Sequence, residues 1–226
     1  MSRLLVNNTS YGTTGVAPAT APPVTIAAWI YPTTLAAGGN DLVYLLNDAG
    51  NGNEFELIIR DAGGSSFRIN AGMASNGIGG TRAASTTALS VNTWYHACGV
   101  YNSLSSRSVF TDGAGKVTNS VTLVDPMAGI NNIGIGVFSP GPATSFSGRM
   151  AEVGIWNVAL DDAEVVALAK GFTPPLIRPQ SLVGYWPLFG NDSPELDRSK
   201  SNNNLTLTGS PVKADHPRIY YPHDIP

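Results

Sequence analysis

The chain has 226 residues, of which only 13% are charged, and its formal net charge is −3. This length suits a single all-β domain with a self-sufficient core, and the sparse charge predicts a neutral-polar surface. Without a long basic run, we expect no nucleic-acid partner. No apolar run approaches a membrane span, and the start, MSRLLVNNTS, lacks the apolar stretch of a signal peptide. The single Cys98 allows no intrachain disulfide, so we expect synthesis in a cytoplasm and stabilisation by packing alone.

The first 137 residues predict short strands separated by turn residues. Residues 4–6 form a first strand, and residues 24–31 are apolar on both faces, which indicates a central buried strand ended by Pro32. Residues 42–46 and 54–60 predict a hairpin, with Phe55, Leu57 and Ile59 pointing inward. Further strands are expected at 67–71, 93–101, 108–112, 116–123 and 132–137, with a long loop holding one weak strand at 72–90.

Residues 146–171 predict a strand that runs into one short helix. On a regular strand, one face carries Ala151, Val153 and Ile155, and the other carries Met150, Glu152, Gly154 and Trp156. Asp161 is a suitable N-cap residue, Glu164 completes a capping-box spacing, and Gly171 is placed to end the helix. A strand joined to a small capped helix is a specific pattern in a chain otherwise rich in strands and turns.

The C-terminal part predicts two more strands and an extended tail. Residues 182–188 and 205–208 are strand-like, so we expect residues 181–210 to complete the sheets of a single domain that spans 1–226. Four prolines in 211–226 disfavour regular structure, yet Ile219, Tyr220 and Tyr221 give this tail a large apolar load. We expect the tail to dock in a fixed extended path and to support assembly, either over its own sandwich or on a neighbouring subunit.

Several of these segments resemble a known family. GRMAEVGIWN (148–157), followed by Ala159, Leu160 and a short helix, is similar to the closing segment of laminin-G-like, concanavalin-A-like jelly rolls. VTIAAWIYP (24–32), WYHACGVY (94–101) and the Asp112-Gly113 turn fit the same family. The resemblance implies an antiparallel two-sheet jelly-roll sandwich with one short helix after the strand ending near Trp156. Ala151 departs from the family, which often carries Asp there, so no polar role is expected at this position.

The resemblance also implies details of the core and of the chain order. LVGYWPL (182–188) resembles the segment that opens many such domains, whereas here it closes the chain, which indicates a permuted arrangement. We expect Trp29, Trp94, Val153 and Ile155 to be buried between the two sheets.

Residues with catalytic chemistry are sparse. Sugar-cleaving relatives of this fold carry a Glu-x-Asp-x-x-Glu strand, and the nearest match, Glu54-Phe55-Glu56, lacks the central Asp and the third acid. We therefore expect no catalytic residue, and a solvent-facing edge at Glu54 and Glu56. His96 and Cys98 share a strand face, but zinc needs three or four ligands, so we expect a partly buried, satisfied histidine.

The polar loop at 192–204 has two interpretations. Asp192, Asp197 and Asn202 offer hard oxygen donors of the kind that calcium takes. Without a fixed spacing motif, a solvated turn is the default, and no cofactor other than calcium is a candidate.

Three function classes remain open. The resemblance favours a non-enzymatic structural or decoration protein of a phage-like virion, made in the host cytoplasm, with other virion proteins or copies of itself as partners in a homo-oligomer. The alternative is a glycan-binding lectin or adhesion module, on a cell surface or secreted. A hydrolase is disfavoured because the catalytic carboxylates are incomplete. The residues alone name no ligand-binding position.

Overall fold

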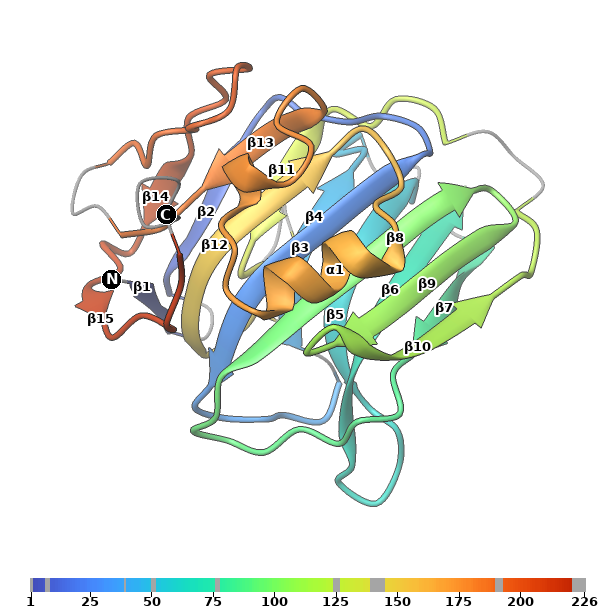
Figure 1. Ribbon diagram of the computed structural model, residues 1–226, viewed down its shortest axis with the longest axis horizontal. Helices are drawn as coiled ribbons and strands as arrows, with labels where there is room; N and C mark the ends of the chain where they lie inside the picture. Colours follow the sequence, from blue (N-terminus) through green and yellow to red (C-terminus); the bar gives the residue numbers. More distant parts are fainter. Residues whose placement is uncertain are drawn as a thin grey trace.

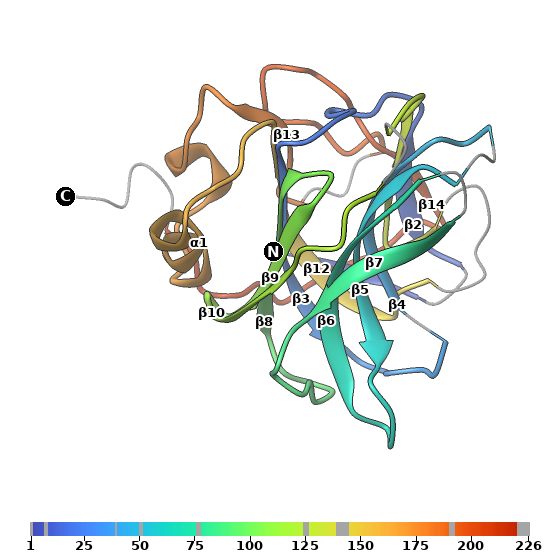
Figure 2. The ribbon, with the colours of Figure 1, turned by 90° about the vertical axis from the view of Figure 1, so that its right-hand side faces the viewer.

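The structure is a computed structural model that describes residues 2–6, 9–38, 40–49, 52–75, 78–123, 127–138, 145–189 and 193–220, with only the backbone described at 78–80. Two antiparallel β-sheets pack face to face, and one short helix lies outside them (Figure 1, Figure 2). This arrangement confirms the expected all-β sandwich.

Sheet A is the sheet that carries the helix on its outer face (Figure 2). Its strands are, in spatial order, β10 (Ala114–Asn119), β9 (Ser106–Thr111), β8 (Tyr95–Ser103), β3 (Val24–Pro32), β12 (Gly148–Trp156), β1 (Ser2–Leu5) and β15 (Lys213–Ala214). An eighth strand, β13 (Leu182–Trp186), pairs with residues 153–156 of β12, while β1 pairs with residues 148–150. An early and a late segment of the chain thus line the same edge of β12.

Sheet B lies opposite and carries no helix on its outer face (Figure 2). Its strands are, in spatial order, β14 (Thr206–Thr208), β2 (Tyr11–Thr14), β11 (Asn132–Ile135), β4 (Asn40–Leu46), β5 (Glu54–Asp61), β6 (Phe67–Ser75) and β7 (Ile78–Ala84). The segment after residue 181 therefore gives β13 to sheet A and β14 to sheet B. The weak strand expected within 72–90 is β7, and β2 and β15 are strands that the sequence pattern did not indicate.

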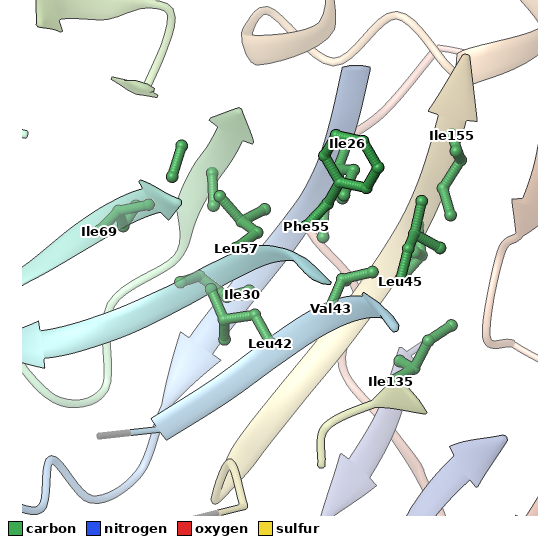
Figure 3. Packing of buried hydrophobic residues seen from close by; sticks show 14 of the residues in the cluster. Ile26, Ile30, Leu42, Val43, Leu45, Phe55, Leu57, Ile69, Ile135 and Ile155 are labelled. Carbon is green, nitrogen blue, oxygen red and sulfur yellow. The ribbon is translucent and has the colours of Figure 1, made fainter. Parts of the chain in front are cut away.

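The core lies between the two sheets (Figure 3). Alternate residues of β3, including Ile26 and Ile30, face Leu45, Phe55 and neighbouring side chains of sheet B. All of these side chains are fully buried. Burial of each such side chain contributes about 1.5–3 kcal/mol to the free energy of unfolding, so this layer holds the sheets together.

A β-bulge in β12 changes the expected alternation. The pairing with β3 shifts between Ala151 and Gly154, and Glu152 adopts a φ of 54°. As a result Met150 and Val153 both join the core between the sheets. The prediction that Met150 faces away from Val153 is therefore wrong, because the bulge inserts one residue into the period of two.

Two of the four expected core positions are also wrong. Val153 and Ile155 are fully buried in the core, but Trp29 and Trp94 are partly exposed and lie outside it. Trp29 belongs to the face of β3 that points away from sheet B. Because β3 is apolar on both faces, its sequence does not distinguish the inner face from the outer one.

Helix α1 (Asp162–Ala169) lies across the outer face of sheet A, over β3 and β8 (Figure 1). The expected capping box is confirmed: Asp161 Oδ1 accepts a hydrogen bond from Glu164 N (2.9 Å), and Glu164 Oε2 accepts one from Asp161 N (2.8 Å). Gly171 has a φ of 97°, which suits its predicted role at the helix end. A 3-10 turn, η1 (Pro174–Leu176), follows. Within the described ranges no helix is long and apolar enough to cross a membrane.

Candidate functional site

The outer face of sheet B carries a row of residues from four neighbouring strands. The register places Tyr44 beside Glu56, Glu56 beside Gly72, and Gly72 beside Arg82. Because Gly72 has no side chain, the guanidinium of Arg82 reaches across β6 and pairs with the Glu56 carboxylate. A Cβ atom at position 72 would collide with that carboxylate and would lie 2.8 Å from Cγ of Arg82. The glycine therefore makes room for the ion pair.

Glu56 lies at the centre of this row and is fully buried. The Tyr44 hydroxyl donates a hydrogen bond to Glu56 Oε2 (2.9 Å) and lies 3.3 Å from Asp41 Oδ1. Burial, together with the nearby carboxylates, raises the pKa of Tyr44, so its hydroxyl remains a donor. A buried charge is tolerated when it is paired and hydrogen-bonded, and Arg82 and Tyr44 meet that requirement. The buried Glu56 thus fixes the positions of the Tyr44 and Arg82 side chains on this face.

Glu54 lies on the same face of β5 but remains partly exposed. Burial, followed by the charge of Glu56, raises the pKa of Glu54 to about 7. Near neutral pH this carboxyl group therefore exists both as a hydrogen-bond donor and as an acceptor. The expected solvent-facing edge is wrong, because β5 lies inside sheet B between β4 and β6. The burial of Glu56 also leaves Glu54 without a second accessible carboxylate on this face of β5.

Two arginines lie side by side at the end of this face. Arg60 of β5 and Arg68 of β6 are direct cross-strand partners. Both side chains are partly exposed, and the Nε atom of each is buried without a hydrogen-bond partner among the described residues. The adjacent carboxylate, Asp61, accepts a hydrogen bond from Gly63 N (2.8 Å) and so organises the turn. The charge pattern of the sequence does not indicate this pair. The two arginines are eight residues apart and become neighbours only through the β5–β6 register.

The outer face of sheet A is divided into a covered half and an aromatic half. Helix α1 covers the first half with Val165 and Leu168. On the other half the Arg149 guanidinium lies 4.6 Å from the centre of the Tyr31 ring, which lies 5.4 Å from the Trp94 ring. These three side chains form an aromatic row across β12, β3 and the residue before β8, with the two rings tilted by 56°.

His96 and Cys98 also lie on the outer face of sheet A. His96 contacts Trp29 edge-on, with 5.4 Å between the ring centres. It is 2% exposed and its Nδ1 has no hydrogen-bond partner among the described residues, so it is neither partly buried nor satisfied as expected. Burial lowers the pKa of His96 to about 3 and raises the pKa of the Cys98 thiol. No group of three potential metal ligands occurs in the described part of the chain.

A groove of about 290 Å³ runs between the start of α1 and strands β8, β9 and β10. Lys116 and Asp162 form an ion pair beside it (2.7 Å). The Lys116 ammonium lies 5.6 Å from the centre of the Phe110 ring, which lines the groove. The aromatic surface of this groove is thus already in contact with a cation from the chain itself.

Asp197, one of the three calcium candidates, is hydrogen-bonded to the backbone of its own loop and of β13. Its two oxygens accept hydrogen bonds from the backbone N–H groups of Tyr185 (2.9 Å), Ser199 (2.8 Å) and Asn203 (2.9 Å). Asn202 is exposed, and Asp192 lies outside the described residues. These contacts give Asp197 a structural role, and calcium binding at this loop stays a prediction.

The described part of the tail lies on its own sandwich. Strand β15 pairs with β1 at the edge of sheet A. Beyond it, Asp215 forms an ion pair with Arg149 (3.0 Å), and His216 Nε2 lies 3.3 Å from Glu152 Oε1. Glu152 is buried and also accepts a hydrogen bond from the Tyr185 hydroxyl (2.6 Å). The tail is therefore joined to β12 at two positions.

The three proposed assembly residues lie at and beyond the end of this path. Tyr220 N donates a hydrogen bond to Gly171 O (2.6 Å), and the Tyr220 ring lies 6.0 Å from that of Phe172. Ile219 is partly buried, Tyr220 is exposed, and Tyr221 lies outside the described residues. Up to Tyr220 the tail therefore packs along its own domain. A role of the tail in assembly stays a prediction.

Residues 6–166 match the family model of the concanavalin A-like lectin/glucanases superfamily. The chain belongs to this superfamily. The match covers the strands of both sheets from β2 to β12 and most of α1. No curated protein matches the chain.

Solved structures with the superfamily fold include proteins of several kinds. A putative carbohydrate binding protein from Bacteroides ovatus is 20% identical, with a TM-score of 0.59 over 92% of this chain and 62% of that one. The IT-sialidase CBM40 from Ruminococcus gnavus is 16% identical, with a TM-score of 0.56 over 74% of this chain and 96% of that one. Tailspike protein 2 of an Escherichia coli O157:H7 bacteriophage is 18% identical, with a TM-score of 0.57 over 82% of this chain and 26% of that one. At these identities the likeness shows the fold alone.

Proposed function

We propose that the chain is a non-catalytic carbohydrate-binding domain whose ligand surface is the outer face of sheet B. The observation that carries this proposal is the partly exposed set of Glu54, Arg60, Arg68 and Arg82, held on three adjacent strands. A sugar presents many hydroxyl groups, and fixed carboxyl and guanidinium groups on strands can hydrogen-bond them without a large loss of entropy.

Membership in a lectin and glucanase superfamily supports this proposal, as do the carbohydrate-binding names of two structural relatives. The outer face of sheet A offers less room for a ligand than that of sheet B. Helix α1 covers part of sheet A, and the tail is joined to β12 beside the aromatic row.

The distribution of carboxylates disfavours glycoside hydrolysis at this face. That chemistry needs two carboxylates on opposite sides of the scissile bond, and Glu56 is fully buried and bound to Arg82 and Tyr44. Without a second accessible carboxylate on this face, Glu54 can hydrogen-bond a sugar but lacks the partner that cleavage requires. We therefore place binding, and no bond cleavage, at this face.

The test is a screen against immobilised polysaccharides, followed by affinity measurement for the glycan bound. Glu54→Ala should weaken binding about tenfold or more, since a hydrogen bond to a charged group contributes about 1.5–3 kcal/mol. Asp162→Ala, an exposed acid on α1, is the matched control and should leave the affinity unchanged. Absence of binding to every glycan, or equal loss in both variants, would contradict the proposal.

A second candidate function is a structural or decoration role on a virion, and one comparison favours it. The structural match covers 26% of a bacteriophage tailspike protein, so a domain with this fold forms part of a phage particle protein. The two functions are compatible, because a particle can carry a glycan-binding domain among copies of itself and other virion proteins. Mass spectrometry of purified virions tests this candidate, and absence of the chain from them would contradict it.

A further inference from the structure

The Arg60–Arg68 pair has no stabilising counter-charge in contact within the described residues. The two residues are direct partners in the β5–β6 register, where like charges destabilise a sheet. None of the ion pairs among the described residues includes either guanidinium. By contrast, Arg82 on the same face is paired with Glu56. An arrangement that costs free energy in the free protein is expected where a ligand offsets that cost.

Among the described residues, the groups around the pair form no ion pair with it. Asp61, next to Arg60, accepts a hydrogen bond within the turn that joins the two strands. Asn70, in the next row, donates its amide N–H to the Arg68 carbonyl oxygen (2.9 Å). The charge of Arg60 also acts on Glu54. It lowers the pKa of Glu54, whereas burial and the charge of Glu56 raise that pKa to about 7. Glu54 therefore carries only part of a negative charge at neutral pH.

The donors of the pair are suited to an oxyanion. Each guanidinium is a planar fork of N–H donors that matches a carboxylate with two parallel hydrogen bonds. The buried Nε atoms of Arg60 and Arg68 have no acceptor among the described residues. Both side chains remain partly exposed, so a ligand can approach them from solvent. Their positions on paired strands fix the two backbone sites from which the forks extend.

We propose that Arg60 and Arg68 form a subsite for the carboxylate of an acidic sugar residue, such as a uronic acid. This inference rests on the proposed function, because it names the class of glycan that the outer face of sheet B binds. A sulfate ester offers similar oxyanion chemistry, and the experiment separates the two sources. Neutral residues of the same glycan would lie along Glu54 and Arg82, further along the sheet.

The experiment compares three soluble probes on the intact chain by affinity electrophoresis and calorimetry. Polygalacturonate carries carboxylates, dextran sulfate carries sulfate esters, and dextran is neutral. We expect binding to polygalacturonate that weakens as salt is raised from low to physiological concentration, since salt screens exposed charges. Dextran should bind at least about tenfold more weakly, a difference of about 1.4 kcal/mol.

Variants test the two arginines directly. Arg60→Gln and Arg68→Gln should each weaken polygalacturonate binding about tenfold, and Arg68→Lys should recover only part of the affinity, because a lysine lacks the fork. Arg198→Gln removes the same charge from an exposed position outside sheet B and should change little. Thermal melting of each variant shows whether a loss of binding reflects a loss of folding.

The outcomes separate this inference from the proposed function. Binding to a neutral glycan that is unaffected by Arg60→Gln and Arg68→Gln would overturn the acidic subsite and leave the carbohydrate-binding function in place. Preference for dextran sulfate over polygalacturonate, lost in both variants, would keep the oxyanion site and overturn the assignment to a carboxylate. If an array of acidic and neutral glycans shows no binding at all, the proposed function fails, and the subsite fails with it.

Discussion

At the scale of single residues, Gly72 determines how the charges on the outer face of sheet B are arranged. Gly72→Ala should lower the free energy of unfolding by about 2–4 kcal/mol, since the new Cβ would occupy the path of Arg82 to the buried Glu56. Urea unfolding measures this loss. Gly15→Ala is the control, because no atom lies within 4 Å of its Cβ position. Equal stability of both variants would contradict the role assigned to Gly72.

His96 should make the stability depend on pH on the acid side. Its pKa is about 3 in the folded chain and about 6.5 in the unfolded one, so below pH 6.5 the unfolded chain binds one more proton. The stability from this group is present above pH 6.5 and falls by about 1.4 kcal/mol per pH unit below it, until the pH nears 3. Urea unfolding at pH 7, 6 and 5 measures the slope. His96→Phe should have a shallower slope, and an identical slope would contradict this account.

At the scale of elements, locally encoded features were predictable and non-local ones were not. Asp161, Glu164 and Gly171 mark the helix ends because capping depends on neighbours within one turn. The bulge at Glu152 is not predictable in this way, since a positive φ at a glutamate leaves no trace in hydrophobic alternation. The sequence predicts β7 only as a weak strand, because its edge position and small residues give little periodic signal.

The tail should stabilise the isolated domain. Removing residues 213–226 deletes β15, the Arg149–Asp215 ion pair and the contact of His216 with the buried Glu152. We expect a lower Tm for the monomer, because sheet A loses the β15 pairing and the buried Glu152 loses a polar partner. Lys213→Ala, at an exposed position, is the control and should melt like the parent chain. An unchanged Tm with reduced self-association would instead assign the tail to assembly.

At the scale of the whole molecule, an early and a late segment of the chain meet on one strand. β1 and β13 share an edge of β12, and Ile155 of β12 lies fully buried in the core between the sheets. The expected permuted order stays a prediction. Ile155→Ala should lower the free energy of unfolding by about 2–5 kcal/mol through loss of packing. Val16→Ala, at a position 53% exposed, should change it by less than about 0.5 kcal/mol. Similar effects of the two substitutions in calorimetry would contradict the assigned register.

The candidate site was less predictable than the fold. The sequence places Glu54 and Glu56 on one strand face but does not predict their different burial. That difference depends on Arg82, which lies 26 positions after Glu56 and pairs with it across Gly72. Arg60 and Arg68 likewise become neighbours only through strand pairing. Sequence patterns identify faces of single strands, whereas a site on a sheet also requires the order and register of the strands.

The central claim, that the outer face of sheet B binds glycan, is tested most directly by NMR titration of the labelled 23.6 kDa chain with an oligogalacturonate. The expected result is a set of shift changes at Glu54, Arg60, Arg68 and Arg82, including the Nε–H signals of the arginines. Signals of Trp29, Tyr31 and Trp94 on sheet A should stay in place. Shift changes confined to those aromatic residues, or to the groove beside Lys116, would contradict the claim.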